Sequence, residues 1–377
     1  MVVRMLLVGI VIILTTNCRQ TLSSSRIKEV WNQENNPLQF EGLIKEKKFS
    51  NLPLSGSLAK KPWSGHYWRA IDTGLAFRWQ RGDDDETKNY PTLTVDELSD
   101  MPAEELATLS PAEKFAIYSG DLSFKFVDWE RSRTRPSKES WEGICHGWAS
   151  AAINYAEPKP FVTDISLGGE TVSLKFASSD VKALLSYFQA IHAREQAFGL
   201  GERCRAYVET VADQNEAGTA CTDTNAGAFH LLMTNRIGIE KKGFVIDVEE
   251  SSQVWNQPVY AYKATVGKSI EKDFVSPAPG TVKQTEITVQ LDYVVETHPD
   301  TEPVETALKS KTYQYRIDLD SKDEIIGGSW ISFERPDYIT MRQRPGDYIV
   351  RHKKHPDRII STYWEKIGEL YKLSQQN

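Results

Sequence analysis

The chain has 377 residues, of which 40% are hydrophobic, enough for a substantial core in one large domain or two ordinary ones. Its formal net charge of -7 argues against nucleic acid as the main partner, because phosphate binding calls for a basic face. The ten tryptophans favour clefts with aromatic walls. The composition therefore indicates a globular protein with no nucleic-acid partner.

The N-terminus, residues 1–17, is predicted to be a signal peptide. Arg4 precedes an apolar run, Met5–Leu14, that is too short to span a bilayer comfortably. The run ends in Leu-Thr-Thr-Asn-Cys, which resembles a bacterial lipoprotein box with Cys18 as the lipidated residue. Asn17 replaces the usual small residue, so an ordinary cleaved signal and a single transmembrane anchor stay as alternatives. We predict an exported protein, in the cell envelope or extracellular, that reaches the membrane through a lipid anchor.

Residues 18–60 are predicted to be a tether, because they are polar and lack strong periodicity up to about Ser57. Residues 61–135 form a predicted helical N-terminal region. Within it, Asp83-Asp84-Asp85-Glu86 is a candidate calcium-binding loop, because hard cations prefer clustered oxygen ligands. A solvated acidic loop is the more common structure for such a run, and the spacing fits no EF-hand.

Two helix starts in this region carry explicit signals. Thr94 with Glu97 makes one capping box, and Ser110 with Glu113 makes a second, with proline at the first helical position. The second helix is predicted to stop at Gly120, because glycine accepts the left-handed conformation that ends many helices.

Residues 136–345 are predicted to be a catalytic core and residues 346–377 to carry a C-terminal helix. Thr171–Phe176 alternates like a strand, and Ser179–Phe198 has apolar residues at helical spacing. Six further runs have strand character: Ala228–Thr234, Gly243–Val248, Val259–Ala264, Thr285–Val295, Thr312–Leu319 and Ile325–Phe333. Tyr338–Lys354 is predicted to be irregular. Because helices come first and strands second, the fold class is α+β, with the helical part packed on an antiparallel sheet.

The four cysteines are assigned by compartment and spacing. Outside the cytoplasm disulfides persist, and Cys204 and Cys221 flank a largely polar segment, so they are the predicted disulfide pair. Cys18 is assigned to the lipid. Cys145 is left as a free thiol, which is uncommon in an oxidising compartment unless the thiol is used or deeply buried.

Cys145 lies at the start of a predicted helix, after the turn at Gly143. Trp148 and Tyr155 follow at helical spacing. The N-terminus of a helix favours thiolate over thiol, and the thiolate is the nucleophile. The alternative is that Cys145 is a small buried hydrophobic residue.

A cysteine nucleophile needs a base, and the base needs an orienting partner. His230 lies in an apolar run that follows a glycine-containing turn, and a satisfied core histidine is an equally common structure there. Asp247 lies in the next apolar strand. Antiparallel neighbours can place the two side by side, where the carboxylate would fix the imidazole tautomer. We predict a Cys145–His230–Asp247 triad.

The hexapeptide Val254–Val259, which contains Trp-Asn-Gln-Pro, resembles the core of the surface elicitor peptide of the secreted oomycete (Phytophthora-type) transglutaminases. The resemblance extends over roughly Lys61 to Tyr338. It is carried by Pro62-Trp63-Ser64, Tyr67-Trp68, Leu109–Phe115, Gly143–Ala149, Leu319-Asp320, Ile325–Trp330 and Pro336-Asp337-Tyr338. The lipoprotein-box cysteine departs from the oomycete proteins and points to a bacterial lipoprotein relative.

The resemblance implies a papain-like, transglutaminase-like cysteine-enzyme fold and calcium-dependent protein crosslinking. Cys145 matches the nucleophile, His230 the base and Asp247 its partner, although Asp320 and Asp337 also lie in matching segments. The implied partners are proteins that supply glutamine and lysine side chains, and Ca²⁺ is the implied cofactor.

The implied reaction forms a thioester between Cys145 and a protein glutamine, then transfers the acyl group to a lysine or another primary amine. Crosslinking requires water to be kept from the thioester, and Trp148 and Trp255 are the predicted walls and substrate contacts. A papain-like cysteine peptidase or a glutamine deamidase is the first alternative, because the same triad serves each reaction. A non-catalytic cell-envelope binding protein is the second.

Overall fold

The computed structural model describes residues 31, 35–39, 42–82, 88–133, 139–191, 197–202, 223–248, 253–342 and 363–376. The predicted signal peptide, the lipidation of Cys18, the acidic loop Asp83–Glu86 and the disulfide between Cys204 and Cys221 lie outside these ranges and stay predictions. Within the described ranges, no helix is both long and apolar enough to cross a membrane.

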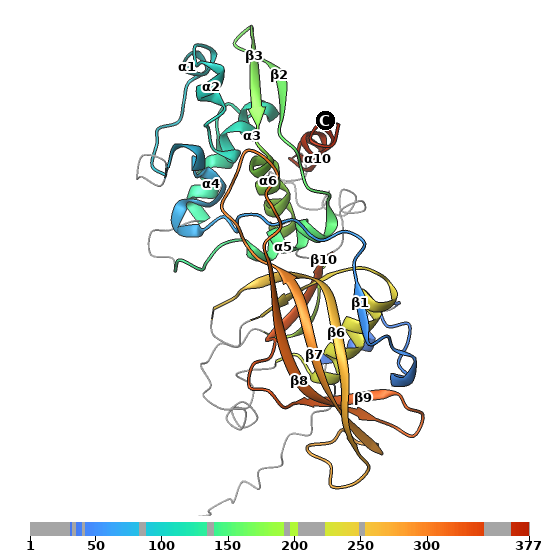
Figure 1. Ribbon diagram of the computed structural model, residues 1–377. Helices are drawn as coiled ribbons and strands as arrows, with labels where there is room; N and C mark the ends of the chain where they lie inside the picture. Colours follow the sequence, from blue (N-terminus) through green and yellow to red (C-terminus); the bar gives the residue numbers. More distant parts are fainter. Residues whose placement is uncertain are drawn as a thin grey trace, which may run out of the picture.

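One end of the molecule is built mainly from helices and a small hairpin (Figure 1). Its elements are α1 (Val95–Ser99), α2 (Ala103–Leu106), α3 (Pro111–Ser119), α4 (Lys125–Arg133), β2 (Phe161–Leu167), β3 (Glu170–Phe176), α6 (Ser178–Ile191) and α10 (Tyr363–Leu373). Short turns of 3-10 helix, η4 (Ala70–Asp72), η5 (Gly74–Ala76) and η6 (Trp79–Arg81), lead into it. Helix α5 (Cys145–Asn154) packs on α6 and on two strands of the large sheet, so it joins the helical part to the sheet.

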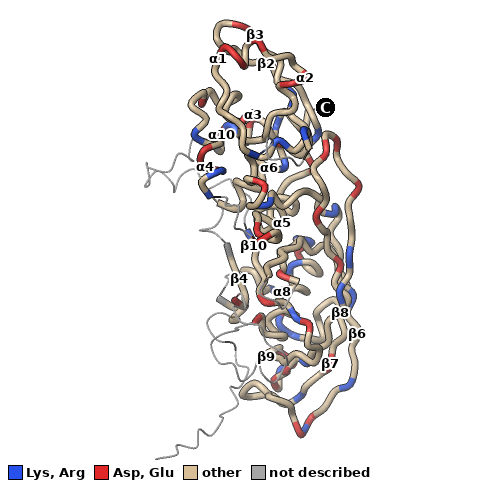
Figure 2. Tube along the Cα trace, turned by 90° about the vertical axis from the view of Figure 1, so that its left-hand side faces the viewer, with Lys and Arg blue, Asp and Glu red and all other residues tan. Residues whose placement is uncertain are grey.

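The other end is an eight-stranded antiparallel sheet that curls along its length (Figure 1). The strand order is β4 (Ala197–Gly201), β10 (Tyr338–Arg342), β5 (Phe244–Asp247), β6 (Asn256–Ile270), β7 (Lys283–Val294), β8 (Leu308–Leu319) and β9 (Ile325–Trp330), and β1 (Ser55–Ser57) pairs with β6. Helix α8 (Ala226–Met233) packs on β8 and β9, and a π-helical turn, η10 (Thr234–Ile239), continues it. Figure 2 shows lysines and arginines mixed with aspartates and glutamates along both parts. The predicted α+β class, with helices first and an antiparallel sheet second, is confirmed.

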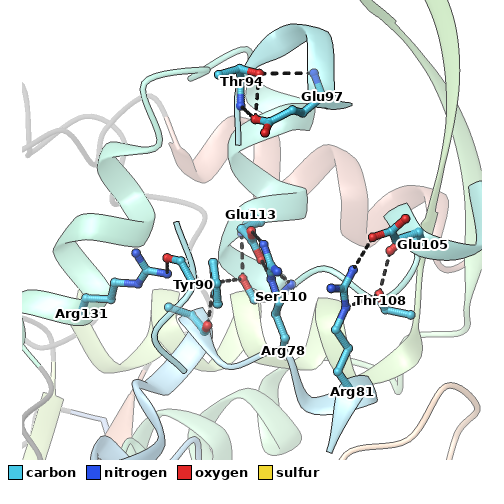
Figure 3. Close-up of polar contacts among 11 residues, drawn as sticks. Arg78, Arg81, Tyr90, Thr94, Glu97, Glu105, Thr108, Ser110, Glu113 and Arg131 are labelled. Carbon is cyan, nitrogen blue, oxygen red and sulfur yellow. Dashed lines mark hydrogen bonds and ion pairs between the residues drawn. The ribbon is translucent and has the colours of Figure 1, made fainter. Parts of the chain in front are cut away.

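Both predicted capping boxes are present (Figure 3). The Thr94 hydroxyl accepts from the backbone N–H of Glu97, and the Glu97 carboxylate accepts from the N–H of Thr94 at 2.7 Å. Ser110 and Glu113 repeat the pattern at the start of α3. Gly120 ends α3 with φ of 79°, as the stop signal predicts.

The second capping box is anchored to the rest of the helical part through a buried ion pair. Arg78 donates to both carboxylate oxygens of Glu113, at 2.9 and 2.5 Å, and its guanidinium lies 3.6 Å from the centre of the Tyr90 ring (Figure 3). The Tyr90 hydroxyl in turn bonds to Ser110. Because one partner alone would leave a buried charge, the pair and the cap depend on each other.

Strand β5 separates two hydrophobic cores. Val245 belongs to the core that contains Trp148 of α5, whereas Ile246 belongs to the core that contains Phe229 of α8. Side chains alternate between the two faces of a strand. One face of β5 therefore looks toward α5 and the other toward α8.

The predicted strand Ala228–Thr234 is wrong, because these residues belong to α8 and the turn after it. The side chain of Asn225 caps this helix by accepting from the N–H groups of Gly227 and Ala228. All eight residues of α8 are buried, so the run has no polar face, and periodicity does not separate a buried helix from a buried strand.

Two further predictions need correction. The described part of the predicted tether, from Gly42 onward, docks on the body: β1 pairs with β6, and Lys45 and Glu46 bond to the side chain of Asn235. The region predicted to be irregular begins with β10, which pairs with both β4 and β5. Both segments are ordered by distant partners rather than by local pattern.

The close approach of α8 to β9 should make Gly227 indispensable. A Cβ at this position would lie 2.1 Å from the carbonyl oxygen of Gly327, so Gly227→Ala must push the helix off the sheet. We expect a loss of about 1–3 kcal/mol in the free energy of unfolding, measured by urea denaturation. The matched control is Gly368→Ala in α10, where the added Cβ meets nothing within 4 Å. Equal losses in both variants would contradict this account.

Candidate active site

The first turn of α5 is held against the segment that contains Tyr67. The N–H of Ile144 donates to the carbonyl of Tyr67 at 2.8 Å. A Cβ on Gly143 would lie 2.5 Å from that same carbonyl oxygen, so the position requires glycine. Cys145 is therefore the first residue of a tightly seated helix, as the sequence predicts.

The sulfur of Cys145 is enclosed, since the residue is only 4% exposed. Its thiol donates to the carbonyl of Val254 at 3.6 Å, and the side-chain amide of Asn256 donates to the sulfur at 3.5 Å. Burial raises the pKa of the Cys145 thiol to about 11, the Asn256 bonds lower it, and the charges of Glu296 and Asp247 raise it. The thiol is therefore protonated at neutral pH in this arrangement.

Asp247 lies on the same side of the sheet as Cys145. It pairs directly with Asn256 in the β5–β6 register, and its Oδ1 accepts from the backbone N–H of Trp255 at 2.9 Å. It also follows Val245 by two residues, so it shares the face of β5 that looks toward α5. The structure thus brings together two of the three predicted catalytic residues.

His230 lies elsewhere. Its Nδ1 forms a hydrogen bond of 2.7 Å with the hydroxyl of Tyr315, and its ring packs against Phe49. Within the described residues, no hydrogen bond or ring contact joins His230 to Cys145 or to Asp247, and its Nε2 has no hydrogen-bond partner. Helix α8 packs in the core on the opposite face of β5 from α5. The predicted side-by-side placement of His230 and Asp247 on adjacent strands is not what the structure has.

The two predicted tryptophan walls differ in exposure. Trp148 is fully buried, and its Nε1 has no hydrogen-bond partner among the residues that the structure describes. Trp255 is half-buried, and its ring packs against that of Tyr67 with 5.7 Å between centroids. The Tyr67 phenol of this pair lies close enough to Cys145 for the charge of the thiolate to raise the pKa of Tyr67.

The acidic residues that the structure describes near Cys145 are engaged with neighbouring protein groups. Among the residues with described coordinates, no group of three or more His, Cys, Asp or Glu side chains could hold a metal ion. The carboxylate of Glu296 instead accepts from Gln257 at 2.9 Å, and burial raises the pKa of Glu296.

Sequence reasoning missed Asn256, Glu296 and Tyr338. The Asn256 amide that contacts the sulfur also donates to the Tyr338 hydroxyl at 3.0 Å. Asn256 lies inside the Trp-Asn-Gln-Pro motif, which is the signal that could have singled it out. Tyr338 lies in Pro336-Asp337-Tyr338, another segment that carries the family resemblance, but nothing local in the sequence links it to Asn256. Glu296, which follows β7, carried no local signal.

The burial of His230 should be visible in the pH dependence of stability. Burial lowers its pKa from the ordinary 6.5 to about 3, so between these values the unfolded chain binds a proton that the folded protein does not. The free energy of unfolding therefore falls as the pH is lowered through this window. Well below pH 6.5, the slope of the free energy of unfolding against pH should be smaller in His230→Gln than in the wild type by about 1.4 kcal/mol per pH unit, measured by urea denaturation.

The matched control is Tyr315→Phe, which removes the hydroxyl but keeps the histidine, and it should keep the wild-type slope. A His230→Gln slope equal to that of the wild type would show that His230 titrates normally in the folded protein.

The separation of His230 from Cys145 predicts that the two do not titrate together. We expect His230→Gln to leave the pH profile of Cys145 modification by methyl methanethiosulfonate unchanged, because no contact links the imidazole to the sulfur. A profile shifted to higher pH would mean that His230 serves the thiol as its base, as the sequence predicts.

Comparison with known proteins identifies the family. A family model described as transglutaminase elicitor matches residues 38–353. The fold is similar to that of the GP42 transglutaminase from Phytophthora sojae, with a TM-score of 0.58 and 21% sequence identity over 87% of this chain and 93% of that one. No curated protein matches the chain. The family match spans α5, α8 and the whole sheet, and the chain belongs to the transglutaminase elicitor family.

Proposed function

We propose that this protein is an acyltransferase of transglutaminase type that uses Cys145 to transfer the acyl group of a protein glutamine to a primary amine. The observation that carries the proposal is the enclosed thiol at the N-terminus of α5, bonded by the Asn256 amide and flanked by Asp247. Membership of the transglutaminase elicitor family supports it. The papain-like character of the fold stays part of this proposal.

The first half-reaction forms a thioester. The Cys145 sulfur bonds to the side-chain carbonyl carbon of the glutamine, the C–N bond breaks, and the nitrogen leaves as ammonia after it gains a proton. The backbone N–H groups at the start of α5 and the helix dipole favour the negative charge that develops on the sulfur and then on the carbonyl oxygen.

The proton of the thiol needs an acceptor. The predicted triad assigns this role to His230, but that ring bonds to Tyr315, and none of its contacts with described residues is to the sulfur. We favour Asp247, because it lies opposite Asn256 and its charge acts on the Cys145 thiol. When the thiol gives its proton to the Asp247 carboxylate, the carboxylate becomes neutral as the thiolate forms. The pair then carries one negative charge instead of two, so the repulsion that raises the thiol pKa is relieved.

The second half-reaction breaks the thioester. The nitrogen of a lysine or another primary amine bonds to the acyl carbon, the C–S bond breaks, and the sulfur recovers a proton. Water competes with the amine and would give deamidation. The enclosure of Cys145, which is only 4% exposed, would limit the access of water to the thioester and supports crosslinking over hydrolysis.

The proposed setting and partners rest on the sequence. Proteins that supply glutamine and lysine side chains are the proposed substrates, and the lipoprotein-box cysteine supports a lipid-anchored enzyme outside the cytoplasm. The family resemblance is the basis for proposing calcium dependence. The candidate acidic loop, Asp83–Glu86, lies outside the described residues.

Replacing the nucleophile tests the proposal. Cys145→Ala should reduce incorporation of a fluorescent primary amine into a glutamine-containing protein to background, because no thioester can form. The variant should stay folded, with a melting temperature within about 5 °C of the wild type, since the thiol is small. Wild-type incorporation that survives in a folded Cys145→Ala protein would refute the proposal.

The products separate the alternatives. Ammonia released by the wild type without amine incorporation would identify a deamidase, and a new peptide terminus would identify a peptidase. Neither product, together with modification of Cys145 no faster than that of free cysteine, would identify a binding protein.

A further inference from the structure

The side-chain amide nitrogen of Asn256 donates two hydrogen bonds. Asn256 Nδ2 lies 3.5 Å from the Cys145 sulfur and 3.0 Å from the Tyr338 hydroxyl oxygen. An amide nitrogen has two hydrogens, so both are used. Asn256 also begins β6, where it pairs with Asp247 of β5. Strand pairing on one side and Tyr338 on the other therefore fix the orientation of this side chain.

The amide oxygen of Asn256 differs from the nitrogen in its hydrogen bonding. Asn256 is fully buried, and its Oδ1 has no hydrogen-bond partner among the residues that the structure describes. Buried acceptors are almost always satisfied, so one that is left open beside a nucleophile calls for an explanation. A ligand that brings an N–H to this position would supply one.

The acyl donor of a transglutaminase has the required group. A glutamine carboxamide that presents its carbonyl carbon to the sulfur carries an NH₂ group on that carbon, with two hydrogens to donate. An ester of similar shape has no N–H there. An acceptor next to the sulfur therefore favours a primary carboxamide over an ester, because the ester leaves the acceptor unpaired.

We propose that Asn256 is a catalytic residue whose amide N–H holds the Cys145 sulfur and whose Oδ1 accepts a hydrogen from the carboxamide of the glutamine donor. This inference rests on the proposed function and deepens it by naming the group that selects the carboxamide.

The electrostatic surroundings make the donor half of this role necessary. Among the residues that the structure describes, the titratable groups linked to the sulfur are the carboxylates of Asp247 on β5 and Glu296 after β7, and the Tyr67 phenol. Both carboxylates disfavour the thiolate. Within the described part of the chain, Asn256 is the side chain that donates a hydrogen bond to the sulfur, so it is the one that favours the thiolate.

Two variants of Asn256 separate its donor from its acceptor. Asn256→Asp keeps an acceptor but loses the donor, and Asn256→Leu loses both at similar volume. Each should shift the pH profile of Cys145 modification by methyl methanethiosulfonate to higher pH. In Asn256→Leu, kcat/KM should fall for both a glutamine peptide and a p-nitrophenyl ester. The fall for the peptide should be larger by a factor of at least about ten, which is the discrimination that one buried hydrogen bond supplies. In Asn256→Asp, kcat/KM should fall by the same factor for the two substrates.

The matched control is Asn154→Leu at the other end of α5, where the amide bonds to Gln189 and to the carbonyl of Arg342 and not to the sulfur. It should leave both the profile and the substrate ratio unchanged. An Asn256→Leu protein with the wild-type profile and an equal loss on both substrates would overturn the inference. If the wild type incorporates no amine while the profile still shifts in Asn256→Leu, the proposed function fails and the contact with the sulfur stands.

Discussion

The contact between the first turn of α5 and the first residues of β6 is the feature on which the candidate site depends. Two close approaches seat the helix. On one side, a Cβ at Gly147 would lie 2.2 Å from the carbonyl oxygen of Ser186, so α5 and α6 are separated by backbone alone. On the other side, Gly143 lets the chain pass the carbonyl of Tyr67. Backbone contacts of this kind have little freedom, and they fix the sulfur opposite Asn256.

This seating has an electrostatic consequence. Enclosure excludes water and strengthens every interaction at the sulfur, including the unfavourable ones with Glu296 and Asp247. A thiol held in this way resists ionisation, and a thiol that stays protonated also resists oxidation. In the proposed reaction, the hydrogen bond from Asn256 is already in place, so it would stabilise the charge on the sulfur without a rearrangement.

Sequence reasoning succeeded where the signal is local. The capping boxes at Thr94 and Ser110, the stop at Gly120 and the start of the helix at Cys145 each depend on residues within a few positions of one another, and each is confirmed. The predicted strand at α8 was wrong, because a segment that is buried on every side shows no alternation of polar and apolar residues that would distinguish a helix from a strand. The contact between Asn256 and Tyr338 arises from the pairing of β5, β6 and β10, which brings together residues far apart in the chain.

The predicted and observed positions of His230 differ because of the same wrong strand prediction. A strand at Ala228–Thr234 would have placed His230 and Asp247 in one sheet, where a triad is natural. As a helix, the segment packs against one face of β5 while Asp247 shares the other face with Val245. The imidazole of His230 is buried with Tyr315 and Phe49, and burial lowers its pKa to about 3, which disfavours the imidazolium of a thiolate–imidazolium pair. The described groups that act on the sulfur are instead an amide donor and carboxylates, and the proposed acyl transfer draws on these.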